Sequence, residues 1–400
     1  MLIIRGIQEL ATCGPKGIVQ NTTIAIDNGL FVDLPKRVSK KDTIIEAGDF
    51  IALPGFVDCH THTVFAGSRA KEYEKKISGA SYADVQKAGG GIHSTVKATR
   101  KADRSALYKK ACCALYEMFS HGTTTVEIKS GYGLTTEEEI KILSVIKMLA
   151  SNVRQDIIPT FLGAHTIPKE YSENRSEYLE TIIHEMLPRM YREKMADGVD
   201  IFCDPLGFTA EETNKILAFA TSLGFKIHVH GEQTAHGGGA KLSAKYKALS
   251  LDHGDFLNDE DISALKDAGT TVVLLPGTIL HLMEWNKVDY PALLKKVKRA
   301  GVPVALATDY NPGSSPIVSM KLIMDLAIRF FKMSYEDALL GATINSARAL
   351  GLEKKLGSIE IEKQADILLI RADSVDDYLH HIGDRKIEMV IKKGQIFQNP

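Results

Sequence analysis

The sequence predicts an α/β protein built on a (β/α)8, TIM-like barrel. Between residues 56 and 309 it contains eight short apolar runs, helical patterns separate most of them, and polar residues collect where the runs end. Runs that are apolar almost throughout are typical of parallel strands buried on both faces. Eight strand–helix units in order indicate a closed barrel, whose functional residues lie at the carboxyl ends of the strands.

The predicted barrel strands are short and rich in β-branched or apolar residues. They are Phe56–His62, Thr123–Ser130, Ile157–His165, Val199–Asp204, Phe225–Glu232, Leu249–Gly254, Thr271–Gly277 and Val302–Asp309. Apolar residues at i, i+3 and i+4 spacing predict helices between them. These helices are Glu137–Ala150, Arg175–Met195, Ala210–Leu223, Asp259–Ala268 and Tyr290–Ala300. The longer connection Arg69–His121 holds Gly89–Gly91, which we expect to be a mobile loop over the site, and then a helix through Cys112.

The two chain ends predict a second, smaller domain. Residues 1–54 and 355–400 alternate like antiparallel strands, with turn residues such as Asp27-Asn28-Gly29 and Lys393-Gly394 between them. The expected strands lie within Leu2–Leu10, Thr22–Leu34, Thr43–Leu53, Gly357–Ile370 and Lys386–Phe397. Neither end has enough strands to be stable alone. We therefore expect one small β-sandwich domain, formed by both ends, around a barrel domain at residues 55–354.

The composition excludes several classes of partner. The chain has 400 residues and a formal net charge of −1, which argues against binding to nucleic acid or to an anionic membrane surface. It contains no apolar run of membrane-spanning length, and Met1–Gly6 lacks a secretory pattern. The five cysteines are odd in number and irregularly spaced, as expected in a reducing compartment. These features predict a cytoplasmic protein.

A pair of histidines follows the first predicted strand and suggests a metal site. In an extended strand, side chains at i and i+2 point to the same face, so His60 and His62 can bind one metal ion side by side. The alternative is a pair of hydrogen-bonded histidines at a strand end. Further polar residues at predicted strand ends are His165, His228, His230, Asp252, His253 and Asp309. Three imidazoles and a carboxylate make a good site for zinc or a similar metal, with room for water.

Five motifs extend over nearly the whole chain. They are Pro54–Arg69, Gly89–Ile92 with Ser94–Val96, His121–Leu134, Thr160–His165 and Ala307–Ser314. The segment Pro54–His62, together with the strand-end histidines and Asp309, resembles the amidohydrolase superfamily. The stretch His60–Arg69 and the other four motifs resemble more closely the imidazolonepropionase family, the ring-opening enzymes of histidine degradation. The segments Lys129–Gly133 and Thr308–Ser314 are specific to that family.

The resemblance implies one zinc or iron ion per chain. The implied ligands are His60, His62, His230 and Asp309. His228 is an alternative to His230, because the two share a face of one strand, but it lies deeper in the predicted barrel. Lys129 raises another alternative, since many amidohydrolases bridge two metals with a carboxylated strand lysine. Its place inside the Lys129–Gly133 motif favours the single metal.

The reaction implied by the resemblance is hydrolysis of the ring amide of 4-imidazolone-5-propanoate to N-formimino-L-glutamate. A bound metal polarises the carbonyl and lowers the pKa of water from about 15.7 to roughly 7. Three residues are candidates to accept the proton of the attacking water: Asp309, His253 and Glu232. Glu232 or Gln233 is expected to hold the ring nitrogens, and Asp58 shares a strand face with His60 and is expected to support it.

The carboxylate tail of this substrate requires a cation. Arg69, in the loop after the first strand, can bind a carboxylate bidentately; the alternative is a surface salt bridge. Asn311, Gly313 and Ser314 are expected to form a turn that presents backbone N–H groups to the ligand. The full set of expected substrate contacts is Arg69, Tyr132, His165, Gln233, Asn311, Gly313 and Ser314.

Two other functions stay open at this point. A deaminase or a hydantoinase-like amidohydrolase also needs the metal, but it does not need the tail contact at Arg69. A non-catalytic barrel scaffold predicts that metal ligands are missing. By resemblance we also expect a homodimer.

Overall fold

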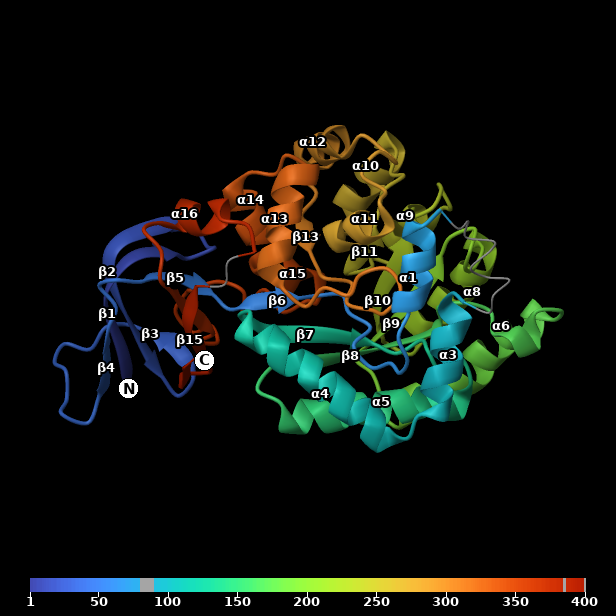
Figure 1. Ribbon diagram of the computed structural model, residues 1–400, viewed down its shortest axis with the longest axis horizontal. Coiled ribbons are helices and arrows are strands. Elements are labelled where there is room, and N and C mark those ends of the chain that lie inside the picture. The colour runs from blue at the N-terminus through green and yellow to red at the C-terminus, as the bar shows by residue number, and fades with distance from the viewer. Residues whose placement is uncertain (80–89, 384–385, 399–400) are drawn as a thin grey trace.

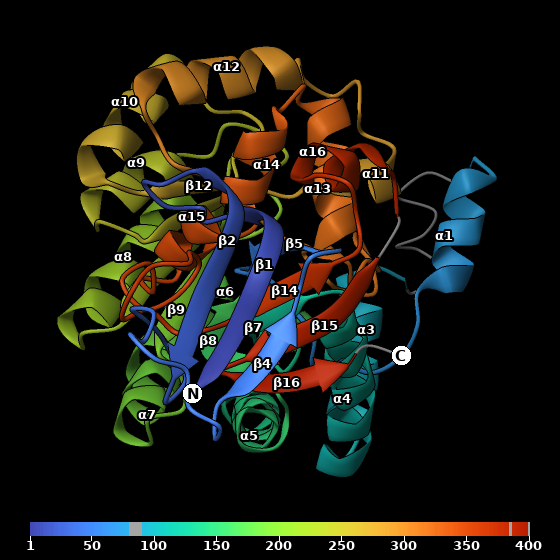
Figure 2. The ribbon, with the colours of Figure 1, turned by 90° about the vertical axis from the view of Figure 1, so that its left-hand side faces the viewer.

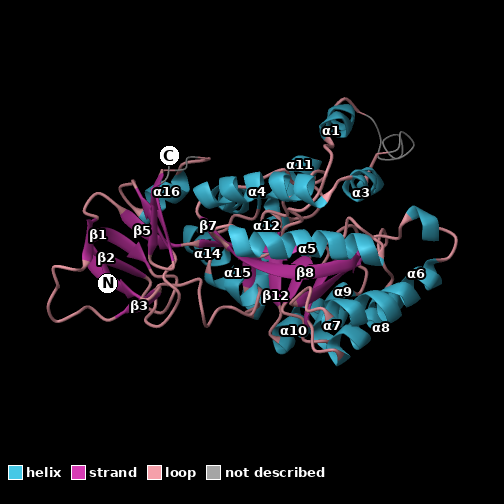
Figure 3. Cartoon of the chain, turned by 90° about the horizontal axis from the view of Figure 1, so that it is seen from below, coloured by secondary structure: helices cyan, strands magenta, loops and turns pink. Residues whose placement is uncertain are grey.

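Eight parallel strands form a barrel surrounded by helices, and strands from both chain ends form a second sheet beside it (Figure 1). This computed structural model describes residues 1–79, 90–383 and 386–398. Seen from below, the helices lie outside the barrel strands (Figure 3). The fold class expected from the sequence is therefore confirmed. Of the predicted glycine loop, Gly89 lies outside the described residues, and Gly91 immediately precedes helix α3 (Ile92–Lys101).

The barrel strands occur where the apolar runs predict them. They are β6 (Phe56–Asp58), β7 (Thr123–Lys129), β8 (Asp156–Ala164), β9 (Gly198–Cys203), β10 (Lys226–Gly231), β11 (Ser250–His253), β12 (Thr271–Leu274) and β13 (Val304–Leu306). Consecutive strands pair in parallel. Between β13 and β6, the backbone N–H of Asp309 donates to the His60 carbonyl and that of His62 donates to the Tyr310 carbonyl, both at 3.0 Å. This closure brings His60, His62 and Asp309 to one rim.

Several strands end earlier than expected. Strand β12 stops at Leu274 because Pro276 begins helix α11 (Pro276–Leu282), a position where the missing proline N–H is tolerated. Strand β6 stops at Asp58, so His60 and His62 follow the strand instead of belonging to it. Their positions are set by the backbone hydrogen bonds that close the barrel.

Most predicted helices are present with small shifts at their ends. They are α5 (Thr136–Asn152), α8 (Ala210–Ser222), α10 (Asp259–Ala268) and α12 (Tyr290–Ala300). The expected single helix Arg175–Met195 is instead α6 (Arg175–Thr181), a π turn (Ile182–Met186) and α7 (Leu187–Arg192). Pro188 has no N–H to donate to the carbonyl four residues earlier, so the regular pattern is interrupted before it.

The remaining helices cover the connections and the outside of the barrel. They are α1 (Ala70–Ile77), α4 (Arg104–Ser120), a 3-10 turn (Lys169–Tyr171), α9 (Gly239–Lys245), α13 (Met320–Phe330), α14 (Tyr335–Gly341), α15 (Ile344–Ala349) and α16 (Val375–His380). Helix α4 contains Cys112, as predicted. Among the described residues, none of the helices combines the length and the apolar character needed to cross a bilayer.

The second sheet joins both ends of the chain, as Figure 2 shows by the blue and red strands side by side. Its strands are β1 (Leu2–Ala11), β2 (Ile18–Asp27), β3 (Leu30–Val32), β4 (Thr43–Glu46), β5 (Ile51–Pro54), β14 (Ile367–Ile370), β15 (Ile387–Lys392) and β16 (Gln395–Gln398). All eight belong to one hydrogen-bonded sheet that branches at β1. Strand β1 pairs in parallel with β4 and β5, which corrects the expectation of antiparallel strands throughout the N-terminal part.

Strand β14 is buried on both faces and connects the sheet to the barrel. Ile367 and Leu369 pack into the small sheet's own apolar cluster, whereas Leu368 and Ile370 pack into the barrel's cluster. This alternation is the period of two that a strand imposes on its side chains. The two parts are also joined by the Lys392 ammonium, which lies 2.8 Å from Asp156 Oδ2 at the start of β8.

Candidate metal centre

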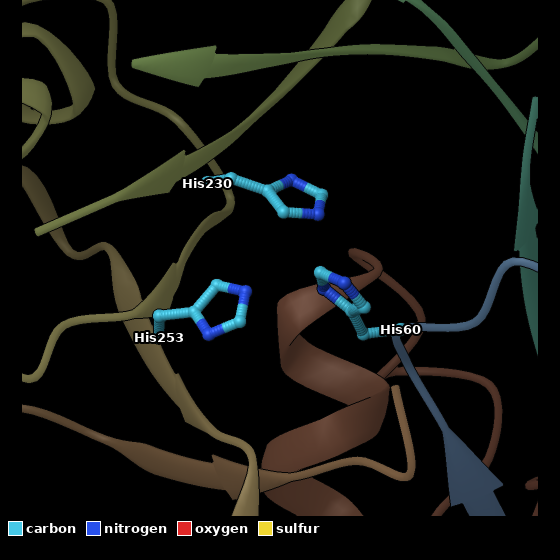
Figure 4. Close-up of side chains that lie close together, drawn as sticks. All are labelled: His60, His230 and His253. Atoms are coloured by element: carbon cyan, nitrogen blue, oxygen red, sulfur yellow. The ribbon is translucent and has the colours of Figure 1, made fainter. Parts of the chain in front are cut away.

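Three histidines meet at the centre of the barrel rim. His60, His230 and His253 point toward one another in Figure 4, and all three are buried. His60 follows β6, His230 lies in β10 and His253 ends β11. Their ligand nitrogens lie within 4.8 Å of one another. The spacing is suitable for one ion between the rings.

His62 and Asp309 complete a second, overlapping set of ligand atoms. Asp309 Oδ1 lies 3.5 Å from His60 Nε2 and 3.4 Å from His62 Nε2. Asp309 has a φ of 51°, in the left-handed region that non-glycine residues rarely adopt. Such backbone strain is typical of functional sites. All four ligands expected from the sequence are therefore brought together, and His253 lies beside them.

The partners of the histidine ring nitrogens show whether this site fits a metal ion. His60 Nδ1 lies 2.6 Å from Asp252 Oδ2, and His230 Nδ1 lies 2.9 Å from Asp200 Oδ2. The buried Nε2 atoms of His60 and His230 have no hydrogen-bond partner, and the Nδ1 contact is a hydrogen bond at His60 but only an ion-pair distance at His230. A histidine held by a carboxylate at Nδ1, with Nε2 free, is the usual arrangement of a metal ligand. The donor set therefore fits a metal ion.

Burial and nearby charge give the histidines different proton affinities. Burial lowers the pKa of His62 to about 4. At His60, burial and the charge of Lys129 act to lower the pKa. The carboxylates of Asp252 and Asp309 outweigh both effects, so the pKa of His60 is raised to about 9. Burial lowers the pKa of His253 well below its usual value, so this imidazole is neutral.

The two alternatives at the metal site have different surroundings. His228 Nδ1 bonds to Ser250 Oγ at 2.9 Å, on the strands below the rim, and His228 is absent from the ligand clusters of the described residues. Lys129 ends β7 as a fully buried side chain whose ammonium lies 2.7 Å from Asp200 Oδ2 and 2.8 Å from Glu127 Oε1. It is paired with carboxylates.

The turn after β13 supports Asp309. Thr278 Oγ1 donates to Asp309 Oδ2 at 2.8 Å, and Ser314 Oγ donates to the same oxygen at 3.2 Å. The N–H groups of Gly313 and Ser314 both donate to Asn311 Oδ1 at 2.8 Å. These N–H groups are therefore used inside the turn, which corrects the expectation that they face a ligand.

Asp58 contacts the same turn and also accepts a hydrogen bond from the backbone of His60, but it does not contact the imidazole ring. Its two oxygens accept hydrogen bonds from Thr308, at 3.0 Å from the backbone N–H and at 2.6 Å from the hydroxyl. Thr308 precedes Asp309, so Asp58 supports the carboxylate ligand. The carboxylate at the Nδ1 of His60 is Asp252.

Arg69 lies beside the turn at the rim. Its Nε donates to Glu72 Oε2 at 2.8 Å, and Glu72 also accepts from the Gly91 N–H at 3.1 Å and from Ser94 Oγ at 2.9 Å. A Cβ at position 313 would overlap Arg69 Nη1. Arg69 thus makes the salt bridge considered from the sequence, and the same contact directs its guanidinium to Gly313.

Tyr132 and His165 lie beside His62. The His165 ring stacks on that of His62, with centroids 5.0 Å apart, and the Tyr132 ring lies 5.9 Å from that of His62. Burial and Asp309 raise the pKa of Tyr132 well above its usual value, so the phenol stays protonated. A neutral hydrogen-bond donor beside the metal-ligating residues can donate to an oxygen of a bound small molecule.

The loop that carries Tyr132 is held by a buried carboxylate. Glu139 of α5 accepts backbone N–H groups from Gly131 at 3.0 Å, from Gly133 at 2.8 Å and from Leu134 at 2.7 Å. The Gly131 carbonyl in turn lies 3.1 Å from His165 Nδ1. Glu139 therefore holds the backbone that positions both Tyr132 and His165.

Glu232 and Gln233 lie just beyond His230 and make local contacts. Glu232 accepts the N–H of Gly237 at 2.6 Å and that of Ala240 at 3.0 Å, and so supports the start of α9. The Gln233 carbonyl accepts from Lys287 Nζ at 2.6 Å. The roles of Glu232 in catalysis and of Gln233 in substrate binding stay predictions.

Sequence reasoning assigned no role to three buried carboxylates, of which Asp252 and Asp200 contact the ligand histidines and Glu127 contacts Lys129. Asp200 lies inside β9, Asp252 inside β11 and Glu127 inside β7, and all are fully buried. The available signal was the charged residue itself, since a strand buried on both faces rarely contains one unless it is paired.

The comparisons with known proteins agree with this geometry. The model of the amidohydrolase family matches residues 51–397. An imidazolonepropionase of Caldanaerobacter subterraneus subsp. tengcongensis is 44% identical over 94% of this chain and 89% of its own. One from Shewanella putrefaciens is 40% identical over 96% of this chain and 94% of its own.

The chain belongs to the imidazolonepropionases of the amidohydrolase family.

Solved structures of other enzymes share the fold. An adenosine deaminase from Xanthomonas campestris with bound zinc superposes with a TM-score of 0.72 and 19% identity, covering 100% of this chain and 93% of its own. A triazine hydrolase variant gives a TM-score of 0.73 at 16% identity, covering 99% and 94%. At these identities the likeness shows the fold alone, and it confirms the barrel with its accompanying sheet.

Proposed function

We propose that this chain hydrolyses the ring amide of 4-imidazolone-5-propanoate to N-formimino-L-glutamate, a step of histidine degradation. The observation that carries the proposal is one rim holding His60, His62, His230 and Asp309 together, with Arg69 beside them. The names and the coverage of the imidazolonepropionase relatives support it.

The metal ion is proposed to be one zinc or iron per chain. His60, His62 and His230 would hold it with imidazole nitrogens and Asp309 with a carboxylate oxygen, a donor set that suits either metal. When bound, the ion supplies Lewis acidity toward the amide carbonyl and toward water. Asp309 Oδ2 is already held by Thr278 and Ser314, which leaves Oδ1 for the metal side.

The remaining residues bind the substrate and move a proton. Arg69 would pair with the carboxylate tail, because its Nε is fixed by Glu72 and its guanidinium lies at the rim. Tyr132, as a protonated phenol, would donate a hydrogen bond to the ligand, and His165 would form the wall beside it. The neutral, buried imidazole of His253 would accept the proton of the attacking water and return it to the leaving ring nitrogen.

Turnover by the purified, metal-loaded protein tests the proposal. We expect conversion of 4-imidazolone-5-propanoate, with N-formimino-L-glutamate identified by mass spectrometry, and no turnover of cytosine, guanine or hydantoin. Turnover of one of these three without hydrolysis of the imidazolone would contradict the substrate. Absence of both metal and turnover would favour a non-catalytic scaffold.

Replacement of Arg69 tests separately whether this residue contacts the carboxylate tail of the substrate. A charged hydrogen bond contributes about 1.5–3 kcal/mol, so Arg69→Met should lower kcat/KM about ten- to hundredfold. An imidazolone without the propanoate tail should be hydrolysed equally by both forms. Arg5→Met is the matched control, because Arg5 makes an exposed ion pair with Glu46 at 3.1 Å in the small sheet. An equal loss on both substrates would contradict the tail contact.

A further inference from the structure

Lys129 is a fully buried cation that takes no part in the proposed reaction. Its ammonium lies 2.7 Å from Asp200 Oδ2, 2.8 Å from Glu127 Oε1 and 3.5 Å from Asp252 Oδ2. The side chains of all four residues are 0% exposed. The ammonium thus lies among three carboxylates below the histidines.

Two of these carboxylates are the ones that contact the metal-ligating histidines. Asp252 Oδ2 lies 2.6 Å from His60 Nδ1, and this is the same oxygen that faces Lys129. Asp200 Oδ2 lies 2.9 Å from His230 Nδ1, and again it is the oxygen that faces Lys129. One ammonium is therefore linked through single carboxylate oxygens to two histidine ligands, one that follows β6 and one in β10.

The carboxylates need a cation between them. Asp200 and Asp252 each offer an oxygen to a cluster, shared with His230, whose atoms lie within 4.8 Å of one another. Two buried carboxylates at this separation repel each other unless a positive charge lies nearby. Lys129 supplies that charge beside Asp200 and Asp252, two members of a group of ligand atoms that could itself hold a cation.

We propose that Lys129 is a positioning residue of the metal centre. It holds Asp200 and Asp252 in the orientation that aligns His230 and His60, and its ammonium occupies the place of a second cation, so that the chain binds one metal ion. The inference rests on the metal site proposed above and extends it to a residue that contacts neither metal nor substrate.

Metal affinity is the measurement that tests the proposal. Replacement of a residue that orients a ligand typically weakens metal binding about 10- to 100-fold. We expect this loss in Lys129→Met, measured by competition with a chelator on the folded protein. We also expect an altered cobalt(II) absorption spectrum, since the histidines change orientation. Unchanged affinity in folded Lys129→Met would overturn the proposal.

A second buried lysine provides the matched control. Lys321 of α13 is 1% exposed and its ammonium lies 2.6 Å from Asp325 Oδ1, away from the rim. Lys321→Met removes an equally buried ion pair, so it should lower stability without changing the metal affinity or the cobalt spectrum. An equal loss of affinity in both variants would show that Lys129 acts only through general stability, and would overturn the proposal.

Glu127 allows the same test if Lys129→Met does not fold. The double variant Lys129→Met with Glu127→Gln removes one positive and one negative charge, so its buried net charge equals that of the wild type. It should bind metal as weakly as expected for Lys129→Met. Glu127→Gln alone should bind normally, because among the described residues no hydrogen bond or ion pair joins Glu127 to a ligand histidine. Wild-type affinity in the double variant would overturn the proposal.

Failure of the proposed function can be distinguished from failure of the role proposed for Lys129. If the wild-type chain binds no metal under any loading condition, both the metal site and the role of Lys129 are overturned. If the wild type binds one ion and Lys129→Met binds it equally well, only the role of Lys129 is overturned.

Discussion

The guanidinium of Arg69 occupies the space that a side chain at position 313 would need. A Cβ on Gly313 would overlap Nη1 and would lie 2.6 Å from Cζ of Arg69. Position 313 follows the metal-ligand candidate Asp309 by four residues, whereas Arg69 enters from the other side of the barrel closure. The absence of a side chain at 313 therefore determines where the arginine can lie.

Gly313→Ala should displace Arg69 and weaken binding of the substrate tail. We expect KM to rise more than kcat falls, because Arg69 binds the tail and does not touch the ring that reacts. Steady-state kinetics measure the split. Gly48→Ala is the control, since a Cβ there meets nothing within 4 Å and Gly48 is far from the rim. A fall in kcat alone would contradict the assignment.

Glu139→Gln should loosen the loop that carries Tyr132. An amide group can replace only one carboxylate oxygen as an acceptor, which leaves a buried N–H of Gly131, Gly133 or Leu134 without a partner. We expect a loss of about 1–3 kcal/mol in the free energy of unfolding, measured by urea denaturation, together with a higher KM.

Glu138, the residue before Glu139, provides the control. Glu138 makes a partly exposed ion pair with Lys141, a class that contributes about 0–1 kcal/mol. Glu138→Gln should therefore change stability little and leave KM unchanged. If both variants behave alike, the backbone contacts of Glu139 do not support the site.

His230→Gln should abolish metal-dependent stabilisation, whereas His228→Gln should retain it. A ligand at about 100 times its Kd stabilises the folded state by roughly 2.7 kcal/mol, so chelation should lower the Tm of the wild type and of His228→Gln. Thermal unfolding with and without chelator measures the difference. The opposite pattern would make His228 the ligand.

Alkylation of the cysteines should depend on burial and pH. Burial raises the pKa of Cys203 to about 11, so at pH 8 about one thousandth of it is the reactive thiolate. Its alkylation rate should rise about tenfold per pH unit up to the pKa. Cys113 is exposed and should react first; mass spectrometry after iodoacetamide treatment gives the order, and Cys113→Ser should remove the fast phase. Rapid modification of Cys203 at pH 8 would contradict its burial.

The barrel and its ligand positions could be predicted because their signals are local. The run Thr123–Ser130 predicts a strand from its own β-branched residues and forms β7, and α10 and α12 begin and end at the expected residues. The interruption at Ile182–Met186 and the parallel pairing of β1 with β4 could not be predicted, because they depend on one proline and on the path of a distant segment.

The sequence by itself determined which residues are placed at the strand ends, and therefore which side chains are available as ligands. Only the tertiary structure decided their partners. Asp252 lies 192 residues from His60 and contacts it across the barrel, and Thr278 reaches Asp309 from the preceding strand–helix unit. These contacts follow from barrel closure, in which hydrogen bonds between the first and last strands bring distant residues together. The periodic patterns in the sequence do not indicate this closure, because they describe single strands and helices and not the pairing of distant ones.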